Sequence, residues 1–360
     1  MASQAPSPGR RPTLADVAAA SGVAISTVSR ALTRPERVNP LTRHRIEEAA
    51  TALGYAPNTT ARALTSGRTR TVAVLVSDVT NPFYFGIIRG TQQELRTAGY
   101  TQLLVDTDES DELEDAVLER LRASYDGAIV AASRLSDRRL AELAARIPLV
   151  AINRQTRGVA SVFIDTPTGI AQAVEHLVSH GHGRIAYVAG PPKSWPNERR
   201  WRAFCAAVER HGAEPARVGP FSPLRSQGAA AADAVLNTGA TACLAFNDLL
   251  AIGMLRRLAE RGVRVPEDLS VVGCDDIFGA DFCHPPLTTI TAPIAHAGRA
   301  AVKLLLEQLG GQAPRRSATL PTHLTIRAST GPAAPVNSRA EPSGARTASR
   351  SPATRAAPRP

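Results

Sequence analysis

Residues 13–30 read Thr13-Leu-Ala-Asp-Val-Ala-Ala-Ala-Ser-Gly-Val-Ala-Ile-Ser-Thr-Val-Ser-Arg30. Thr13 precedes Asp16 by three residues, a spacing that predicts a capping box, in which the two residues satisfy each other's free backbone amides at a helix start. The apolar residues that follow fall on one helical face, and Gly22 interrupts them with a residue that readily adopts the left-handed backbone of a tight turn. The stretch therefore begins with a short helix and a glycine turn.

A second helix is expected from about Ile25 to Leu32. It would bury Val28 and Leu32 and leave Arg30 outside, beside small hydroxyl residues. Two short helices joined by a glycine turn are typical of the helix-turn-helix motif, whose second helix enters the major groove of DNA. From these residues alone, an ordinary pair of core helices is an equal alternative.

Two more helical segments follow the pair. Residues 40–53 are amphipathic, and Asn39 is a suitable cap for them. Asn58 can cap a further, very short segment at 59–65. Because helix nucleation is costly, this last segment is expected to order only when it packs against something.

The formal net charge of +10 is concentrated at the two ends of the chain. Residues 1–70 hold ten arginines against four acidic residues, and residues 331–360 hold five arginines against one glutamate. Residues 71–330 hold 27 basic and 27 acidic side chains and are neutral. Because arginines that displace counterions supply most non-specific DNA affinity, the basic head indicates a nucleic-acid partner. A role in solubility alone is the competing interpretation, chiefly for the tail.

Several classes of protein are disfavoured by features that the sequence lacks. It has no run of about 18 apolar residues, and residues 1–12 do not resemble a secretory signal, so we expect a cytoplasmic protein without a membrane span. The four cysteines, at 205, 243, 274 and 283, lack the close spacing of zinc or redox motifs. We therefore predict reduced cysteines that lie mostly in the core, with no metal and no cofactor; a zinc site is a remote alternative.

From Thr71 to about residue 273, short apolar runs alternate with helical patterns. Such alternation predicts parallel sheets covered by helices on both faces. The strands are too many for one sheet, and a break near 165–169 suggests two lobes of similar build. A ligand would lie between them, at the carboxyl ends of the strands. Beyond Thr330 the chain is rich in Pro, Ala, Ser, Thr and Arg, and we expect disorder there.

The whole pattern resembles the LacI/GalR family of bacterial transcription regulators over roughly residues 12–328. The matching motifs are Thr13-Leu-Ala-Asp-Val-Ala, Ser21-Gly-Val, Ser26-Thr-Val-Ser-Arg30, Leu53-Gly-Tyr-Ala-Pro-Asn58, Asn81-Pro-Phe-Tyr84, Phe246-Asn-Asp248 and Val271-Val-Gly-Cys-Asp-Asp276. The resemblance implies an all-α helix-turn-helix head with a hinge helix, and an α/β body of two doubly wound parallel-sheet lobes like type I periplasmic binding proteins.

The expected domain order follows from the same resemblance. It comprises a disordered segment at 1–11, the helix-turn-helix domain at 12–57, a hinge helix and linker at 58–70, a two-lobe effector-binding and dimerisation domain at 71–330, and a disordered basic tail at 331–360.

The resemblance also implies which residues bind DNA. They are Thr13, Ile25, Ser26, Thr27, Ser29, Arg30, Thr33, Asn58, Ala61 and Leu64. Arg30 can donate two hydrogen bonds to guanine, and Ile25 can contact a thymine methyl, although a core role for Ile25 is an alternative. Leu64 falls where the hinge helices of two subunits push a leucine pair into the minor groove and kink the DNA.

An effector, most simply a sugar, is implied between the lobes, because aromatic faces with amide and carboxylate partners suit a sugar. The implied residues are Asn81, Phe83, Tyr84, Asn153, Arg154, Trp195, Arg199, Phe221, Asn247 and Asp275. Glu198 stands where the family's pocket arginine is expected, so Arg199 and Arg200 both remain candidates, of which we choose Arg199.

The leading prediction is thus a ligand-controlled repressor that binds a pseudopalindromic operator as a homodimer. A free sugar-binding transport protein is the second hypothesis, which the basic head and the absence of a signal segment oppose. An enzyme is the third, but we find no phosphate loop, spaced metal ligands or nucleophile motif. We interpret His176, His180 and His182 as surface residues at a helix end.

Overall fold

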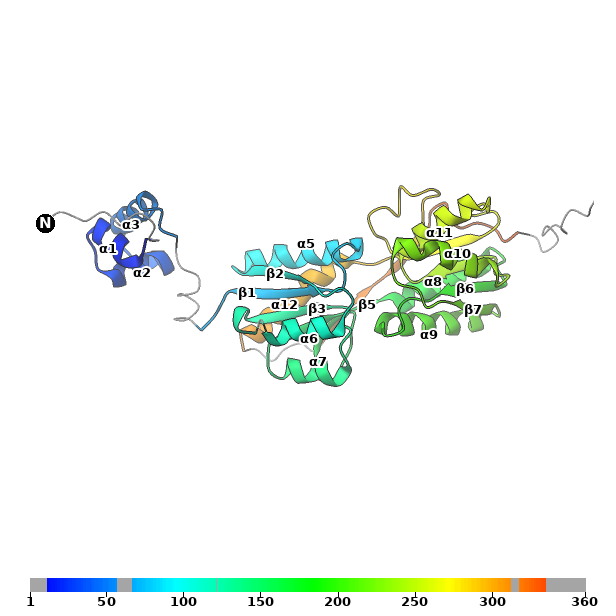
Figure 1. The fold of residues 1–360 in the computed structure, drawn as a ribbon, viewed down its shortest axis with the longest axis horizontal. Helices are drawn as coiled ribbons and strands as arrows, with labels where there is room; N and C mark the ends of the chain where they lie inside the picture. Colours follow the sequence, from blue (N-terminus) through cyan, green and yellow to red (C-terminus); the bar gives the residue numbers. More distant parts are fainter. Residues whose placement is uncertain (1–11, 57–66, 121, 312–316, 335–360) are drawn as a thin grey trace, which may run out of the picture. The chain divides into compact units, whose positions relative to one another are not determined.

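The computed structural model describes residues 12–56, 67–120, 122–311 and 317–334 (Figure 1). The chain divides into two compact units near Thr71, and each is described by itself. The first unit, the head, contains α1 (Leu14–Ser21), α2 (Ile25–Thr33), a single 3-10 turn (Pro35–Arg37) and α3 (Pro40–Ala52). Its core is formed by Val17, Val28 and Ile46, which are fully buried.

The helix starts of the head follow the predicted capping chemistry. The capping box is present: Thr13 N–H donates to Asp16 Oδ2 at 2.7 Å, and Asp16 N–H donates to Thr13 Oγ1 at 3.4 Å. Gly22 ends α1 at φ 65°, and Asn39 Oδ1 accepts from Leu41 N–H ahead of α3. One core prediction is wrong in detail, because α2 buries Ala31 next to Val28 while Leu32 is only partly buried.

The second unit, the body, has two lobes. The sheet of the first lobe has the order β11-β5-β4-β3-β1-β2, and its first five strands pair in parallel. Its strands are β1 (Thr71–Val76), β2 (Thr101–Asp106), β3 (Gly127–Ala131), β4 (Leu149–Ile152), β5 (Ala160–Asp165) and β11 (Ser317–Pro321), and its helices are α5 (Pro82–Thr97), α6 (Asp111–Arg120), α7 (Asp137–Ala144) and α12 (Ile294–Leu309).

The second lobe repeats this plan with the order β12-β10-β9-β8-β6-β7. Its strands are β6 (Arg184–Val188), β7 (Glu214–Val218), β8 (Ala242–Ala245), β9 (Ser270–Asp275), β10 (Thr288–Thr291) and β12 (His323–Thr325), and its helices are α8 (Thr166–Ser179), α9 (Trp195–Arg210), α10 (Gly228–Leu236) and α11 (Asp248–Glu260). Only β12 runs antiparallel to its neighbour. The predicted pair of parallel α/β lobes is confirmed.

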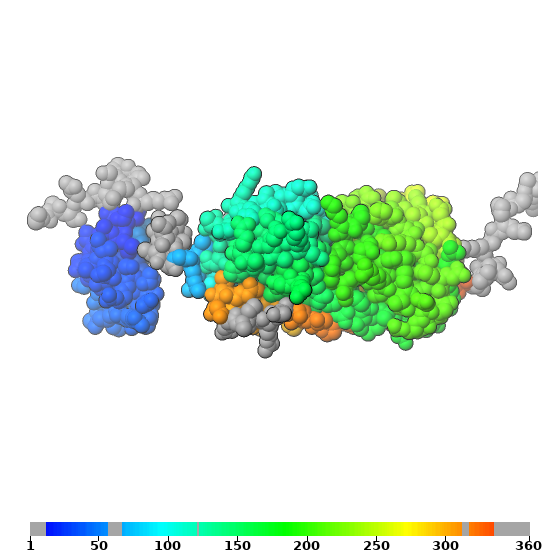
Figure 2. Space-filling view, turned by 90° about the horizontal axis from the view of Figure 1, so that it is seen from below, coloured from blue at the N-terminus to red at the C-terminus, as the bar shows by residue number. Residues whose placement is uncertain are grey.

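The chain crosses between the lobes three times among the described residues: after β5, after β10 and between β11 and β12. The first crossing falls where the sequence pattern breaks. The second returns α12 to the first lobe, where its orange surface lies beside the cyan and teal surface of earlier segments (Figure 2). There α12 packs closely on α5, because a Cβ at Gly90 would meet Ala295 O at 2.2 Å.

Two sequence expectations for the body need correction. The apolar pattern misses β7, β10, β11 and β12, which are short and rich in Thr, Ser, Pro or charged residues, so pairing with a neighbouring strand rather than composition makes them strands. The expected tail boundary at 331 is also too early. Gly331 N–H donates to Ser270 Oγ, and Ala333 N–H donates to His180 O at 2.8 Å. No helix among the described residues is long and apolar enough to span a bilayer.

Candidate functional site

The head presents the predicted polar face of α2 to solvent. Ser26 and Arg30 are exposed, and Thr27 and Ser29 are half-buried. Ile25 is 53 % exposed, so the alternative that it belongs to the core is wrong. This leaves an apolar tip followed by hydroxyl groups and a guanidinium on one helix, groups that can contact base edges and phosphates.

The remaining predicted DNA-binding residues divide into two groups. Thr13 and Thr33 are exposed at the start of α1 and the end of α2, and Thr33 Oγ1 donates to Ser29 O at 2.7 Å. Asn58, Ala61 and Leu64 lie outside the described residues.

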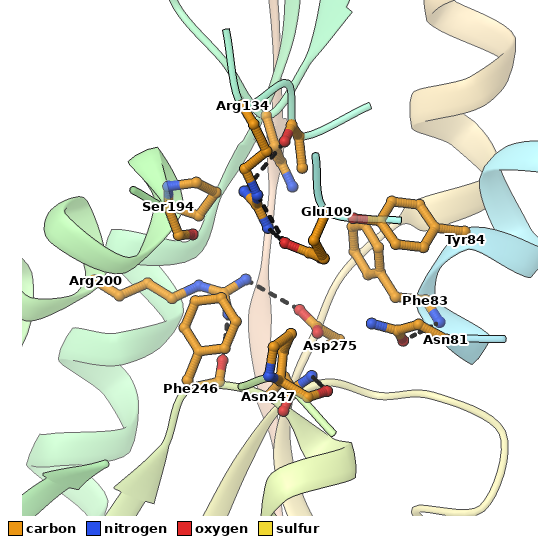
Figure 3. A pocket seen from close by; sticks show the side chains of 14 residues that line it. Asn81, Phe83, Tyr84, Glu109, Arg134, Ser194, Arg200, Phe246, Asn247 and Asp275 are labelled. Carbon is orange, nitrogen blue, oxygen red and sulfur yellow. Dashed lines mark hydrogen bonds and ion pairs between the residues drawn. The ribbon is translucent and has the colours of Figure 1, made fainter. Parts of the chain in front are cut away.

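In the body, a pocket lies between the two lobes (Figure 3). The cavity has a volume of about 410 Å³, part of which is open to solvent. The lining residues are Asn81, Phe83, Tyr84, Glu109, Ala132, Arg134 and Asn153 of the first lobe, and Ser194, Pro196, Arg200, Pro223, Phe246, Asn247 and Asp275 of the second. They follow the carboxyl ends of the parallel strands, where a ligand site is expected in such sheets.

Each lobe supplies one ion pair to the pocket (Figure 3). In the first lobe, Arg134 donates from Nε to Glu109 Oε2 at 2.7 Å and also donates from Nη2 to the same oxygen. In the second lobe, Arg200 Nη2 donates to Asp275 Oδ1 at 3.1 Å, Nη1 donates to Phe246 O, and the guanidinium lies 4.8 Å from the centre of the Phe246 ring. Both arginines are buried, so these pairs hold the two walls in fixed geometry.

Three asparagines connect the pocket to the surrounding backbone. Asn81 Oδ1 accepts from Phe83 N–H, and Asn247 Oδ1 accepts from Leu250 N–H, so both side chains cap the helices behind them. Asn153 Oδ1 accepts from the N–H of Ile164 on β5. Asn247 Nδ2 already donates to Pro223 O at 3.0 Å, whereas the amide nitrogens of Asn81 and Asn153 have no acceptor among the described residues and are available to donate to a ligand.

The backbone is strained where it lines the pocket. Glu109, Ala132, Asn153 and Asp275 all have positive φ, at 58°, 54°, 55° and 119°. Side chains other than glycine rarely adopt this conformation, and such residues cluster at functional sites. This clustering supports the pocket as the place where the body binds its ligand.

Burial also changes the acid–base properties of the pocket. Desolvation raises the pKa of Asp275 to about 6, against the opposing effect of the nearby Arg200 charge. Behind it, desolvation and the charge of Asp275 raise the pKa of Asp248 to about 7, although Thr289 Oγ1 and Ile277 N–H donate to its carboxylate. Burial also raises the pKa of Tyr84, which keeps its phenol protonated.

The structure places six of the ten predicted effector residues on the pocket: Asn81, Phe83, Tyr84, Asn153, Asn247 and Asp275. The choice of Arg199 is a misplacement, because Arg200 lines the pocket while the Arg199 guanidinium stacks 4.8 Å from the centre of the Phe163 ring and 5.0 Å from that of Trp195.

Three other predicted residues do not line the pocket. Trp195 packs edge-on against Phe163, although its neighbours at 194 and 196 line the pocket. Arg154 Nη2 turns away to Leu135 O and Asp137 Oδ1. Phe221 packs against the core of the second lobe.

Eight lining residues were missed: Glu109, Ala132, Arg134, Ser194, Pro196, Arg200, Pro223 and Phe246. Most follow directly after predicted strands or open a predicted helix, so the rule that ligands bind at strand ends could have found them. Glu109 also follows a predicted strand, β2, through two successive left-handed residues, 108 and 109.

The interpretation of the three histidines needs correction. His182 is 1 % exposed, and its ring bonds to Thr241 Oγ1 and Gly331 O. His176 Nε2 bonds to Thr330 Oγ1 at 2.9 Å. These two rings fasten the segment after β12 to the second lobe and are structural. In the described ranges, no group of three or more His, Cys, Asp or Glu residues is arranged to hold a metal ion.

Known proteins match both units. The model for bacterial regulatory proteins of the lacI family matches residues 13–58, and the model for a periplasmic binding protein-like domain matches residues 174–330. The HTH-type transcriptional repressor CytR of Escherichia coli is 34% identical over 327 residues, which cover 88% of this chain and 96% of that protein. The HTH-type transcriptional regulator MalR of Streptomyces coelicolor is 32% identical over 333 residues and covers 88% of this chain and 96% of its own length.

Solved structures agree with this match. The lac repressor dimer bound to operator and the anti-inducer ONPF superposes with a TM-score of 0.82 at 28% identity, covering 89% of this chain and 100% of its own. A complex of the transcriptional regulator CelR with cellobiose has a TM-score of 0.65 at 32% identity, with the same coverage. The sequence matches and the shared architecture lead to one conclusion: the chain belongs to the LacI family of bacterial transcription regulators.

Proposed function

We propose that this regulator is a repressor that binds a pseudopalindromic operator as a homodimer, and that a sugar bound between its lobes controls this binding. The observation that carries the proposal is the exposed face of α2, which presents Ile25, Ser26 and Arg30 at the place where a helix-turn-helix meets DNA. Operator DNA as the partner would place its action in the cytoplasm.

Each residue of that face has a proposed role. Arg30 donates to a guanine, Ser26 contacts a base edge, and Ile25 packs on a thymine methyl. Thr13, Thr27, Ser29 and Thr33 hold phosphates, since hydroxyl groups around a recognition helix fix its register on the duplex. The ten arginines of residues 1–70 supply the salt-dependent part of the affinity.

The hinge is proposed from the family resemblance, because Asn58, Ala61 and Leu64 lie outside the described residues. In this proposal the segment forms a helix on DNA, and Leu64 of each subunit enters the minor groove and kinks the duplex. The proposed domains are a head at 12–57, a hinge and linker at 58–70, and a body that extends from 71 to at least Ala333. The end of the linker is held by Asp126, which precedes β3 and accepts from Thr69 N–H and Arg70 N–H.

The homodimer is supported by exposed aromatic residues on the body. Phe278 and Phe282 are 79 % and 64 % exposed, with ring centres 5.0 Å apart, in the loop between β9 and β10. Large exposed apolar groups of this kind are typical of protein interfaces. The related lac repressor structure is a dimer on its operator, so a second copy of this chain is the proposed partner.

Gel-shift titration tests the proposal. Labelled duplexes from the region upstream of the regulator's own gene should bind in the presence of excess non-specific competitor, with an affinity that falls steeply as salt rises. Absence of sequence-specific binding at every salt and sugar condition would contradict it.

A further inference from the structure

We propose that the inter-lobe pocket selects an uncharged polyhydroxy ligand and rejects its phosphorylated counterpart, and that Glu109 determines this selectivity. This inference deepens the proposed function, because it concerns the ligand of the same pocket. It is carried by the charge arrangement of the two walls and not by the relatives.

The pocket contains two cations and two anions, and each cation is already paired. Among the lining residues the charged groups are Glu109 and Arg134 in the first lobe and Arg200 and Asp275 in the second. Each lobe therefore neutralises its own wall, and the ligand meets no net positive charge.

The terminal nitrogens of the two guanidiniums are also committed, and Arg200 Nε, which has no partner among the described residues, is buried away from solvent. Arg134 uses Nε and Nη2 on Glu109 and Nη1 on Ala132 O at 3.2 Å. Arg200 uses Nη2 on Asp275 and Nη1 on Phe246 O. An arginine that binds phosphate needs a free fork of parallel N–H donors, and neither arginine offers one.

The polar atoms left over suit hydroxyl groups. Within the described ranges, no residue donates a hydrogen bond to Glu109 Oε1 or Asp275 Oδ2, so both can accept from a ligand. The Nδ2 atoms of Asn81 and Asn153 likewise have no acceptor there and can donate. A hydroxyl group donates and accepts at once, whereas a phosphate at neutral pH accepts almost exclusively.

A phosphate group would also be repelled. It would approach the free oxygens of two carboxylates in the same pocket, Glu109 Oε1 and Asp275 Oδ2. Charge repulsion at such short range is strong where little water screens it. Glu109 is the residue to change, because it is partly exposed at 30 % and pairs with an arginine that would otherwise be free.

Tryptophan fluorescence gives a readout confined to the pocket region. The chain has two tryptophans, Trp195 and Trp201, both on α9 of the second lobe, and Trp195 lies between two lining residues. The head has no tryptophan, so phosphate that binds to its arginines does not contribute a direct signal.

The test titrates full-length protein with inorganic phosphate and with matched pairs such as glucose and glucose 6-phosphate, or ribose and ribose 5-phosphate. Wild type, Glu109→Gln and Glu112→Gln are compared. Glu112 is exposed at the start of α6 and does not line the pocket, so its change removes the same charge from the same segment. Asp275→Asn is the second pocket variant, which frees Arg200 in the other lobe.

We expect phosphate to bind Glu109→Gln at least about tenfold more tightly than wild type or Glu112→Gln, and Asp275→Asn to gain phosphate binding as well. Any sugar that binds wild type should do so more tightly than its phosphate. Equal phosphate affinity in all four proteins, or a wild type that prefers the phosphorylated partner, would overturn the inference. Neither result depends on DNA, so failure of operator recognition would be seen separately.

Discussion

The face of α2 and the inter-lobe pocket differ in how far their proposed contact residues are exposed to solvent. On α2 the predicted contact groups project into solvent, with Ile25 53 % exposed. In the pocket, Asp275 and Arg200 are nearly fully buried and already bonded to each other. The head can therefore lose a contact residue without losing its fold, whereas the pocket combines binding and stability in the same side chains.

This difference predicts the largest mutational effect, in the second lobe. Arg200→Ala should destabilise the body by about 3–5 kcal/mol, because it leaves Asp275 buried without its cation. Arg199→Ala should cost about 1 kcal/mol, since only the stacking on Phe163 and Trp195 is lost. Chemical denaturation followed by tryptophan fluorescence compares the two. A similar loss in the free energy of unfolding for both variants would contradict the assignment of Arg200 to the pocket.

A contact residue of the head should behave in the other way. Arg30→Ala should weaken binding to the operator by about 1–3 kcal/mol and reduce discrimination against non-specific DNA, with unchanged thermal stability. Arg37→Ala, which removes an exposed charge outside α2, is the control and should lower both affinities equally. Fluorescence anisotropy on operator and scrambled duplexes gives the ratio. If Arg30→Ala leaves that ratio intact, Arg30 does not read a base.

The buried carboxylate makes ligand binding depend on pH. Burial raises the pKa of Asp275 to about 6, so the group is charged above that pH and protonated below it. The charged form accepts hydroxyl groups from the ligand, and affinity should therefore fall about tenfold as the pH drops from 7 to 5. The affinity of Asp275→Asn should change far less over this range. Titrations at stepped pH measure both profiles, and a wild-type affinity that rises on acidification would contradict the role of Asp275.

The smallest effect is expected at a helix cap of the head. Thr13→Ala removes one side of the capping box and should lower the local stability of α1 by about 1 kcal/mol. Thr51→Ala is the control, because its hydroxyl only bonds back to Glu47 O within α3. Hydrogen exchange of the α1 amides in the full-length protein measures the change. Equal protection in both variants would mean that the capping box does not hold α1.

The same contrast explains what the sequence could predict. Helical periodicity correctly placed the polar face of α2, because one-sided burial leaves a pattern along the chain. It could not decide between Arg199 and Arg200. An error of one residue in the register of a helix turns the predicted face by about 100°, which is enough to exchange two neighbouring side chains. The strand-end rule predicted a ligand between the lobes. The family resemblance, and not that rule, supplied Asn81, Asn153 and Asp275.

What the sequence missed depends on contacts between distant segments. Glu109 and Arg134 meet because two loops of the first lobe bring them together, and neither loop has a periodic pattern. The short strands β10 and β12 form at the crossings between lobes, where their pairing, not their composition, makes them strands. Sequence patterns thus identify helices, strands and the carboxyl edges of the sheets. Which charged side chains pair inside the pocket can be seen only in the tertiary structure.

The central claim is that a ligand held by the body controls DNA binding by the head. The most direct test measures operator affinity with and without a saturating amount of the sugar that tryptophan fluorescence selects, in wild type and in Asp275→Asn. We predict that the sugar changes wild-type affinity at least about tenfold, which is a coupling free energy of about 1.4 kcal/mol, and leaves Asp275→Asn unchanged. Operator affinity that ignores the sugar in wild type, or responds equally in both proteins, would contradict the claim.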